Sequence, residues 1–214
     1  KAMMDYLVEG IAEIPEMTEV HIISNHKFAH HFEEWAKTKA QKITVVDDGT
    51  STNETRLGAV KDIQFAIEKL SIDDDMLVIA GDNLLDFSLT KFISYVKEKK
   101  TSCCMRYYEK DEKKLLKCGV YTVDENDKII EMTEKSPTPA THWVGPAFYY
   151  YTKEDATRIQ EAIDAGCGVD APGSFIAWLC KQKDVHSMEM PGSRYDIGNL
   201  ESYESVQKEY KGIC

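Results

Sequence analysis

Short apolar segments alternate with amphipathic segments over the first half of the chain. The apolar runs, rich in β-branched residues, are VHIIS at 20–24, ITVV at 43–46 and MLVIA at 76–80. Short, continuously apolar runs are typical of strands that are buried on both faces. Segments with helical periodicity lie between and after them, at 28–40, 57–70 and 89–99. This alternation predicts an α/β fold, a Rossmann-like and mostly parallel sheet with helices on both faces.

The pattern changes after residue 100, where one strand-like run follows another. These runs are TSCCMRYY at 101–108, CGVYTV at 118–123, KIIEM at 128–132 and VGPAFYYY at 144–151. The residues DENDK at 124–128 have the Asp and Asn content of a tight turn, so the second and third runs are expected to form a hairpin. We therefore predict an antiparallel β insertion in the second half. Helices are expected after it, at 153–163, 174–182 and 200–210.

The first residues, KAMMDYLVEGI, have their apolar positions on one helical face. Met4, Leu7, Val8 and Ile11 recur at the spacing of an amphipathic helix. No capping residue and no strand comes before this helix in the sequence. The segment is therefore expected to follow an earlier part of a βα unit.

Composition limits the classes of partner. The 214 residues include 37 acidic and 26 basic side chains, a net charge of −11, and we expect one domain over 1–214. A basic footprint for a nucleic acid polymer or an anionic membrane is lacking. No apolar run reaches the length of about 20 residues that a bilayer span needs, and we expect a cytoplasmic protein. The six cysteines include no CxxC pair, which makes a zinc site unlikely and favours buried, inert thiols.

The stretch MLVIAGDNLL contains the first candidate site. Gly81, Asp82 and Asn83 directly follow a predicted buried strand. Ligands of open α/β sheets bind at the carboxyl ends of strands. Asp82 is placed there to hold Mg²⁺, a hard cation that takes few protein carboxylates. An ordinary turn with Asx hydrogen bonds explains the same three residues.

A second carboxylate, Asp196, lies in SRYDIGNLESY, ahead of the last predicted helix. Together with Asp82 it would clamp a divalent ion from the other half of the chain. Taken alone, Asp196 is better explained by a cap or turn ahead of the helix, for which Asn199 could be the N-cap.

A third candidate site follows the KIIEM strand. Glu134 is suited to accept hydrogen bonds from sugar hydroxyls, and Lys135 to hold a phosphate as a point charge. A surface ion pair beside the prolines at 137 and 139 explains the same residues.

Other polar segments allow weaker predictions. The polar segment 47–63 is long for a βα loop, and long loops are often functional. Its Asn53 is suited either to capping the next helix or to reading a base. We expect the histidines at 26, 30 and 31 to lie on a solvated helix face, and Tyr149 to Tyr151 to pack within a strand.

Taken in order, these segments resemble the nucleotidyltransferases that make nucleoside-diphosphate sugars, such as glucose-1-phosphate thymidylyltransferase. KAMMDYLVEGI resembles the family's KPM helix, LGAVKDI the loop and helix after the third strand, and AGDN its metal-binding GDN. CGVYTVDENDKIIEMTEKSP resembles a YGVV…EKP hairpin, WVGPAFYYY a GxYxF strand, and RYDIGNLESY a closing WxDxGT segment. Six motifs in register are a stronger signal than any one of them.

The resemblance implies a reaction of nucleotide-sugar biosynthesis in which NTP and sugar 1-phosphate give NDP-sugar and pyrophosphate. Asp82 and Asp196 would hold Mg²⁺, and Lys135 would hold the sugar phosphate. The substrate-binding residues implied are Asn53, Leu57 and Gly58 at the nucleobase, Gly81 and Asn83 beside the metal, and Gly119, Glu134, Val144 and Gly145 at the sugar.

The chain departs from the family pattern at its start. The first strand and the glycine-rich GxGTRxxP loop of the family do not occur in these 214 residues. Ala2 replaces the usual proline, and Asn199 stands where the family prefers threonine. We expect that an N-terminal segment of about 25 residues, one strand and one loop, precedes Lys1 in the intact protein.

Two alternative functions remain open from the sequence. One is an inactive sugar-nucleotide-binding or regulatory domain that lacks the phosphate loop. The other is a cytidylyltransferase acting on a phosphorylated amino alcohol such as phosphocholine, with Trp143 and the tyrosines at 149–151 as an aromatic cage. A Rossmann dehydrogenase is disfavoured because no GxGxxG motif opens a helix. The sequence does not specify the base, the sugar or the oligomeric state, although a homo-oligomer is compatible with it.

Overall fold

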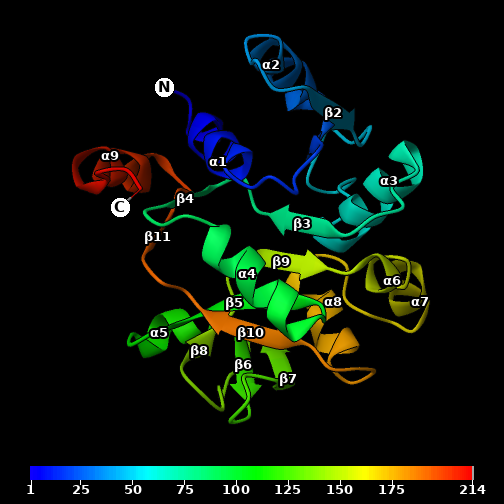
Figure 1. Cartoon of the computed structure of the whole chain (residues 1–214), viewed down its shortest axis with the longest axis vertical. Coiled ribbons are helices and arrows are strands. Elements are labelled where there is room, and N and C mark those ends of the chain that lie inside the picture. The colour runs from blue at the N-terminus through cyan, green and yellow to red at the C-terminus, as the bar shows by residue number, and fades with distance from the viewer. Residues whose placement is uncertain (214) are drawn as a thin grey trace.

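The computed structural model describes residues 1–213 of the 214-residue chain (Figure 1). Its helices are α1 (Met3–Ala12), α2 (His26–Ala36), α3 (Ala59–Leu70), α4 (Thr90–Lys99), α5 (Glu112–Leu115), α6 (Lys153–Ala156), α7 (Ile159–Asp164), α8 (Gly173–Leu179) and α9 (Leu200–Glu209). Its strands are β1 (Val20–Ser24), β2 (Ile43–Asp47), β3 (Met76–Ile79), β4 (Asn83–Leu85), β5 (Cys103–Tyr108), β6 (Gly119–Val123), β7 (Ile129–Glu134), β8 (Trp143–Val144), β9 (Phe148–Tyr151), β10 (His186–Glu189) and β11 (Arg194–Asp196). Within residues 1–213, no helix is long and apolar enough to cross a membrane.

The predicted strands and helices of the first half are present. β1 and β2 pair in parallel, from Val20 opposite Ile43 to Ser24 opposite Asp47. α2 follows β1 directly because Asn25 caps it, its side-chain oxygen accepting a hydrogen bond from the backbone N–H of Phe28. α1 buries Leu7 and Val8, as the periodicity of the first residues predicts.

The largest sheet has seven strands in the order β3-β9-β5-β8-β6-β7, with β10 paired to β5. Only the β5–β10 pair in this sheet is parallel, and the other pairs are antiparallel. The α/β class with an antiparallel insertion is confirmed. The expectation of a mostly parallel sheet is wrong for residues 1–213, because β9 returns from the second half and pairs antiparallel with β3.

Side chains of β9 alternate between two hydrophobic clusters on opposite faces of this sheet. Phe148 packs into the cluster under α4, with Phe92, Ile93 and Val96. Tyr149 and Tyr151 point to the other face and pack against α3, α7 and α8. Figure 1 shows α4 on one side of the sheet. Helices thus cover both faces, and the prediction that Tyr149 to Tyr151 serve strand packing is confirmed.

The predicted hairpin is also present. β6 and β7 pair antiparallel from Gly119 opposite Glu134, through the turn in which Asp124 accepts hydrogen bonds from the backbone of Asn126 and Lys128. The segment expected to form one helix at 153–163 is instead divided into α6 and α7. Among residues 1–213 the cysteines are free thiols, and Cys103, Cys104 and Cys180 are buried, as expected. Cys214 lies outside the described residues.

A small third sheet connects the two ends of the chain to the core. β4 and β11 pair antiparallel, and α9 follows β11. Figure 1 shows α1 and α9 on the same side of the molecule, with both ends of the chain near them. The rings of Tyr6 and Tyr210 meet edge to face at 5.3 Å.

Within residues 1–213, no strand joins β1 to β3, so the β1–β2 pair and the seven-stranded sheet are separate. The single domain over 1–214 stays a prediction, and so do the further strand and loop before Lys1. Intact mass and N-terminal sequencing of the protein as isolated from its source would test for that strand and loop. A folded, active protein that begins at Lys1 would contradict it.

Candidate active site

The turn after β3 places Asp82 at the carboxyl end of that strand, as predicted. Gly81 and Asp82 form the turn, and Asn83 begins β4. Asn83 is 3% exposed, and its side-chain amide donates to Asp82 Oδ1 at 2.6 Å and to the carbonyl of Ala80 at 3.3 Å. A Cβ at Gly81 would lie 3.3 Å from the sulfur of Met4, so α1 packs against this turn.

Asp196 lies beside Asp82, because β11 pairs with β4. Asp196 is opposite Asn83 in the ladder, and the backbone N–H of Ile197 donates to the carbonyl of Asp82 at 2.8 Å. Asp82 as a whole is exposed, but its carboxyl group lies among neighbouring polar side chains. Partial burial raises the pKa of Asp82, and the negative charge of Asp196 raises it further. The structure thus brings together the two carboxylates predicted to hold the metal.

Arg194 is a member of this group that the sequence analysis did not identify. Its Nη1 donates to Asn83 Oδ1 at 2.5 Å and to Asp196 Oδ2 at 3.1 Å, and its Nη2 donates to the hydroxyl of Tyr107 at 3.3 Å. Its charge acts against the rise in the pKa of Asp82. The sequence contained one signal: an arginine at the position of the tryptophan in the WxDxGT pattern.

These residues fit a magnesium ion by the chemistry of their donors. Asp82 and Asp196 offer hard carboxylate oxygens, and Mg²⁺ is usually held by one or two carboxylates, with water and phosphate oxygens completing its shell. Within residues 1–213, no group of three or more His, Cys, Asp or Glu side chains is arranged to hold a metal.

Glu134 lies in a narrow, glycine-lined space. It is opposite Gly119 in the β6–β7 hairpin. A Cβ at Gly119 would lie 2.9 Å from Glu134 Oε1, and a Cβ at Gly173, the first residue of α8, would lie 2.5 Å from the same atom. Burial raises the pKa of Glu134, and the neighbouring charge of Lys135 lowers it. Gly173 was not predicted.

Val144 and Gly145 adjoin this space. Val144 pairs with Val120 of β6, and the backbone N–H of Gly145 donates to the carbonyl of Gly119 at 2.9 Å. A Cβ at Gly145 would lie 2.3 Å from the ring of Tyr121, which is fully buried. The predicted sugar-site residues Gly119, Glu134, Val144 and Gly145 are thus neighbours.

Lys135 is exposed and its backbone has a positive φ of 49°. Its N–H donates to the carbonyl of Cys118 at 2.9 Å, which ends the hairpin. Among residues 1–213, no hydrogen bond or ion pair joins its side chain to Asp82 or Asp196. Lys135 thus lies beside Glu134 and its neighbours Gly119, Val144, Gly145 and Gly173, which we call the Glu134 group. We call Asp82 and Asp196 the carboxylate pair.

The predicted nucleobase loop lies at the carboxyl ends of β1 and β2, where it borders a pocket of about 450 Å³. Asn53 lines this pocket, and Leu57 and Gly58 lie just before α3, with Gly58 at its N-cap position. Gly58 has φ +92°, and a Cβ there would lie 2.6 Å from the carbonyl oxygen of Val169. The pocket is lined by Ile23, Ser24, Asn25, Lys27, Phe28, Asp48, Thr50, Ser51, Thr52, Asn53, Arg56 and Asp62.

Asp62 and His26 are titratable groups beside this loop. Oδ1 of Asp62 is buried without a hydrogen-bond partner. Burial and the nearby Asp48 raise the pKa of Asp62 to about 6. His26 Nδ1 lies 2.6 Å from Asp47 Oδ2, which raises the pKa of His26. The histidine is largely exposed, in keeping with the solvated face predicted for it.

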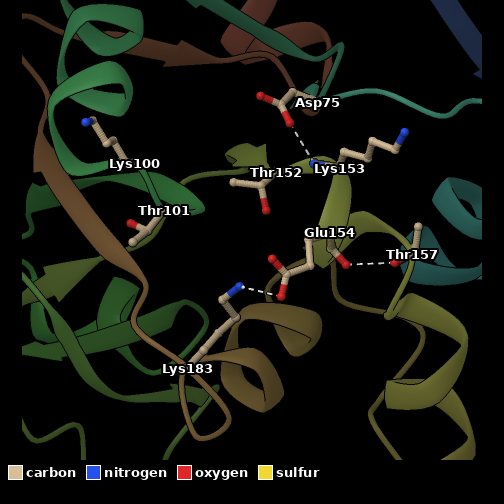
Figure 2. A pocket seen from close by; sticks show the side chains of 8 residues that line it. All are labelled: Asp75, Lys100, Thr101, Thr152, Lys153, Glu154, Thr157 and Lys183. Atoms are coloured by element: carbon tan, nitrogen blue, oxygen red, sulfur yellow. Dashed lines mark hydrogen bonds and ion pairs between the residues drawn. The ribbon is translucent and has the colours of Figure 1, made fainter.

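A second pocket, of about 480 Å³, contains none of the predicted site residues (Figure 2). Asp75 lies on its wall, just before the amino end of β3, whereas Asp82 follows the carboxyl end. Lys183 pairs with Glu154 at 3.4 Å and with buried Asp155 at 2.8 Å, and Lys153 pairs with Asp73 at 2.7 Å. Because these charges are satisfied within the protein, we assign this pocket no role.

Comparison with known proteins identifies the family of this chain. Residues 1–212 match the nucleotidyl transferase family. The chain belongs to this family. Among curated nucleotidyl transferase relatives, the bifunctional protein GlmU of Methanocaldococcus jannaschii is 25% identical over 127 residues, which is 59% of this chain and 29% of GlmU. The chain therefore spans under a third of that relative's length.

Solved structures share the fold of this nucleotidyl transferase. A Bacillus anthracis protein provisionally named glucose-1-phosphate thymidylyltransferase superposes with a TM-score of 0.80 at 18% identity, covering 99% of this chain and 83% of that one. A UDP-glucose pyrophosphorylase superposes with a TM-score of 0.79 at 17% identity, covering 98% of this chain and 86% of that one. The predicted nucleotide-diphospho-sugar transferase fold is confirmed.

Proposed function

We propose that this protein transfers a nucleoside monophosphate from an NTP to a sugar 1-phosphate, giving an NDP-sugar and pyrophosphate. One observation carries the proposal: β4 and β11 join Asp82 and Asp196 at the carboxyl end of β3. Ligands of α/β sheets bind at this edge. Family membership and the names of the relatives support the same chemistry.

In this reaction an oxygen of the sugar phosphate attacks the α-phosphorus of the NTP. The bond from the α-phosphorus to the bridging oxygen breaks, and pyrophosphate leaves with that electron pair. The protein contributes positioning and charge stabilisation. Asp82 and Asp196 would hold Mg²⁺, which when bound neutralises phosphate charge. Arg194 donates a hydrogen bond to Asp196, and Asn83 donates one to Asp82.

The sugar would lie against the Glu134 group. The carboxylate of Glu134 can accept hydrogen bonds from hydroxyls, and the main chain of Gly119 and Gly145 lies beside it. Exposed Lys135 would hold the sugar phosphate as a point charge. Asn53, Leu57 and Gly58 would border the nucleobase beside the loop pocket.

A phosphocholine acceptor is disfavoured by the surroundings of the aromatic residues. The guanidinium of Arg106 lies 5.0 Å from the ring centre of Trp143, so a cation of the protein already occupies that face. Tyr149 and Tyr151 are buried in the core. Tyr150 packs in the cluster on the other face of the sheet from Trp143, and its hydroxyl donates to Asp75 Oδ2 at 2.7 Å. The amino-alcohol alternative therefore has no aromatic cage at the residues predicted for it.

A pyrophosphate-release panel of the common NTPs against sugar 1-phosphates tests the proposal. We expect release with at least one pair, dependent on Mg²⁺ and lost in Asp82→Ala. Asp184→Ala is the control, because Asp184 pairs with Lys128 at the surface, at 2.6 Å. Binding of NDP-sugar without any turnover would favour the inactive binding domain. Cytoplasmic location and homo-oligomerisation stay predictions from the sequence.

A further inference from the structure

Arg194 begins the strand that carries Asp196, yet its side chain is only 17% exposed. A guanidinium that has lost most of its water must find acceptors within the protein. Asn83, Asp196 and Tyr107 provide them, and the guanidinium carbon also lies 5.1 Å from the ring centre of Tyr107. This cation is therefore held in one place and in one orientation.

The contact with Asn83 extends the influence of Arg194 to Asp82. Because Asn83 Oδ1 accepts from Arg194, the amide nitrogen of Asn83 must face the other way. That nitrogen donates to Asp82 Oδ1 at 2.6 Å. Arg194 is thus bonded to one carboxylate directly and to the other through one buried amide.

We propose that Arg194 is a positioning residue. It orients Asp82 and Asp196 to bind a divalent cation, by direct contact with Asp196 and through the amide of Asn83. The inference rests on the proposed function, since it deepens the account of the same site. It assigns the role to an arginine at the position where the WxDxGT pattern of the sequence comparison has tryptophan.

The contacts of Arg194 use the fork of donors and the flat face of a guanidinium. A planar guanidinium has donors on both terminal nitrogens and can stack on a ring while it bonds in its own plane. A lysine ammonium is a point charge that keeps the charge beside Asp196 but lacks this fixed fork. An apolar side chain such as methionine fills a similar volume but has neither the charge nor the hydrogen-bond donors.

A titration with Mn²⁺ alone tests whether Arg194 acts by positioning the carboxylates or only through its charge. Binding is measured as the loss of the free Mn²⁺ signal in electron paramagnetic resonance. In Arg194→Met we expect Mn²⁺ binding to weaken about 10- to 100-fold, the usual effect of removing a group that orients metal ligands. If Arg194 acted only through its charge, its removal would tighten cation binding instead. In Arg194→Lys we expect only part of the loss to be restored.

Arg158→Met is the matched control. Arg158 bonds the carboxylate of Glu161 at 2.8 Å and lies 4.8 Å from the ring centre of Trp178, so it resembles Arg194 in its contacts but belongs to no candidate site. We expect Mn²⁺ binding unchanged in this variant. Thermal unfolding of each variant shows whether it is folded. If Arg194→Met does not fold, Tyr107→Phe is the alternative variant, because it removes one hydrogen bond to the guanidinium. We expect it to weaken Mn²⁺ binding several-fold.

Equal or tighter Mn²⁺ binding in folded Arg194→Met would overturn the inference. If Arg194→Met does not fold, unchanged Mn²⁺ binding in Tyr107→Phe would overturn the inference. Absence of Mn²⁺ binding in the unaltered protein would overturn it too, together with the assignment of the metal site. Pyrophosphate release in the unaltered protein is measured separately, so failure of the transfer reaction is distinguished from failure of the positioning role.

Discussion

The carboxylate pair and the Glu134 group are assembled in different ways. Glu134 and Gly119 face each other within one hairpin, so a local turn sets their distance. Asp82 and Asp196 come from segments far apart in the sequence and are joined by a three-residue ladder and by Arg194, which reaches Asn83 across 111 positions. The first arrangement depends on local register and the second on tertiary contacts.

The difference also concerns what each group needs from its neighbours. The Glu134 group needs the absence of side chains, since a Cβ at Gly119, Gly145 or Gly173 would overlap existing atoms. The carboxylate pair needs additional polar side chains that hold it in place. Substitution should therefore harm the first group by adding atoms and the second by removing them.

The largest effect is expected at the carboxylate pair. Asp196→Asn removes a charge that the proposed metal site uses but keeps the side-chain shape, so we expect the proposed pyrophosphate release to fall at least about 100-fold. Steady-state kinetics would measure this, with Asp184→Asn at the surface as the control. Activity within a few-fold of the unaltered protein would remove Asp196 from the site.

The next effect is on stability, in the Glu134 group. Gly145→Ala places a Cβ about 2.3 Å from the buried ring of Tyr121, which has no free space to move into. We expect a loss of about 2 kcal/mol in the free energy of unfolding, the usual cost of overpacking. Urea unfolding measures it.

Gly10→Ala in α1 is the matched control for this overpacking. Among residues 1–213, a Cβ there meets only Ile213 Cδ1, at 3.9 Å. Since alanine favours a helix over glycine, this variant is expected to be about 0.5–1 kcal/mol more stable. Equal stability of Gly145→Ala and the unaltered protein would show that the glycine-lined space is looser than described.

Asp62, beside the nucleobase loop, is a third case: within residues 1–213, its Oδ1 is buried without a hydrogen-bond partner. The pKa of Asp62 is raised to about 6. In the unfolded chain this carboxyl ionises near pH 4, while the folded protein retains the proton until about pH 6. Its contribution to stability is therefore complete below about pH 4 and is lost as the pH rises through 6.

Asp62→Asn should remove this pH dependence. At pH 7.5 we expect the variant to be about 1 kcal/mol more stable than the unaltered protein, with the two differing less at pH 5. Urea unfolding between pH 4.5 and 8 is the measurement, and Glu201→Gln on exposed α9 is the control. An equal pH dependence in Asp62→Asn would assign the effect to other groups.

The smallest effect concerns the helix behind the carboxylate pair. Asn199 Oδ1 accepts a hydrogen bond from the backbone N–H of Ser202 at 2.8 Å and caps α9. Asn199→Ala is expected to cost about 1 kcal/mol in thermal unfolding and to leave the Mn²⁺ affinity nearly unchanged. A large loss of Mn²⁺ binding would mean that α9 helps to hold Asp196.

Local patterns predicted much of the fold. The β6–β7 hairpin, the strand at residues 20–24 and the cap at Asn199 follow from side-chain chemistry within a few residues, so the sequence was sufficient for them. The division of 153–163 into α6 and α7 was not predicted, because its amphipathic pattern continues through Thr157 and Arg158. The antiparallel pairing of β3 with β9 was missed because strand order is a long-range property.

The sequence by itself identified the positions that the proposed site uses: Asp82 after a buried strand, Asp196 before a capped helix and Glu134 at the end of a hairpin. Strand ends and turns are specified by neighbouring residues, but turns or a surface ion pair explain these residues locally, and their proposed roles came from six family motifs taken in order. Only the tertiary structure decided that Asp82 and Asp196 adjoin, that Gly173 faces Glu134 and that Arg194 connects the carboxylates. The physical reason is that short-range bonds between distant segments form only once the chain is packed, and no local pattern records which partners will meet.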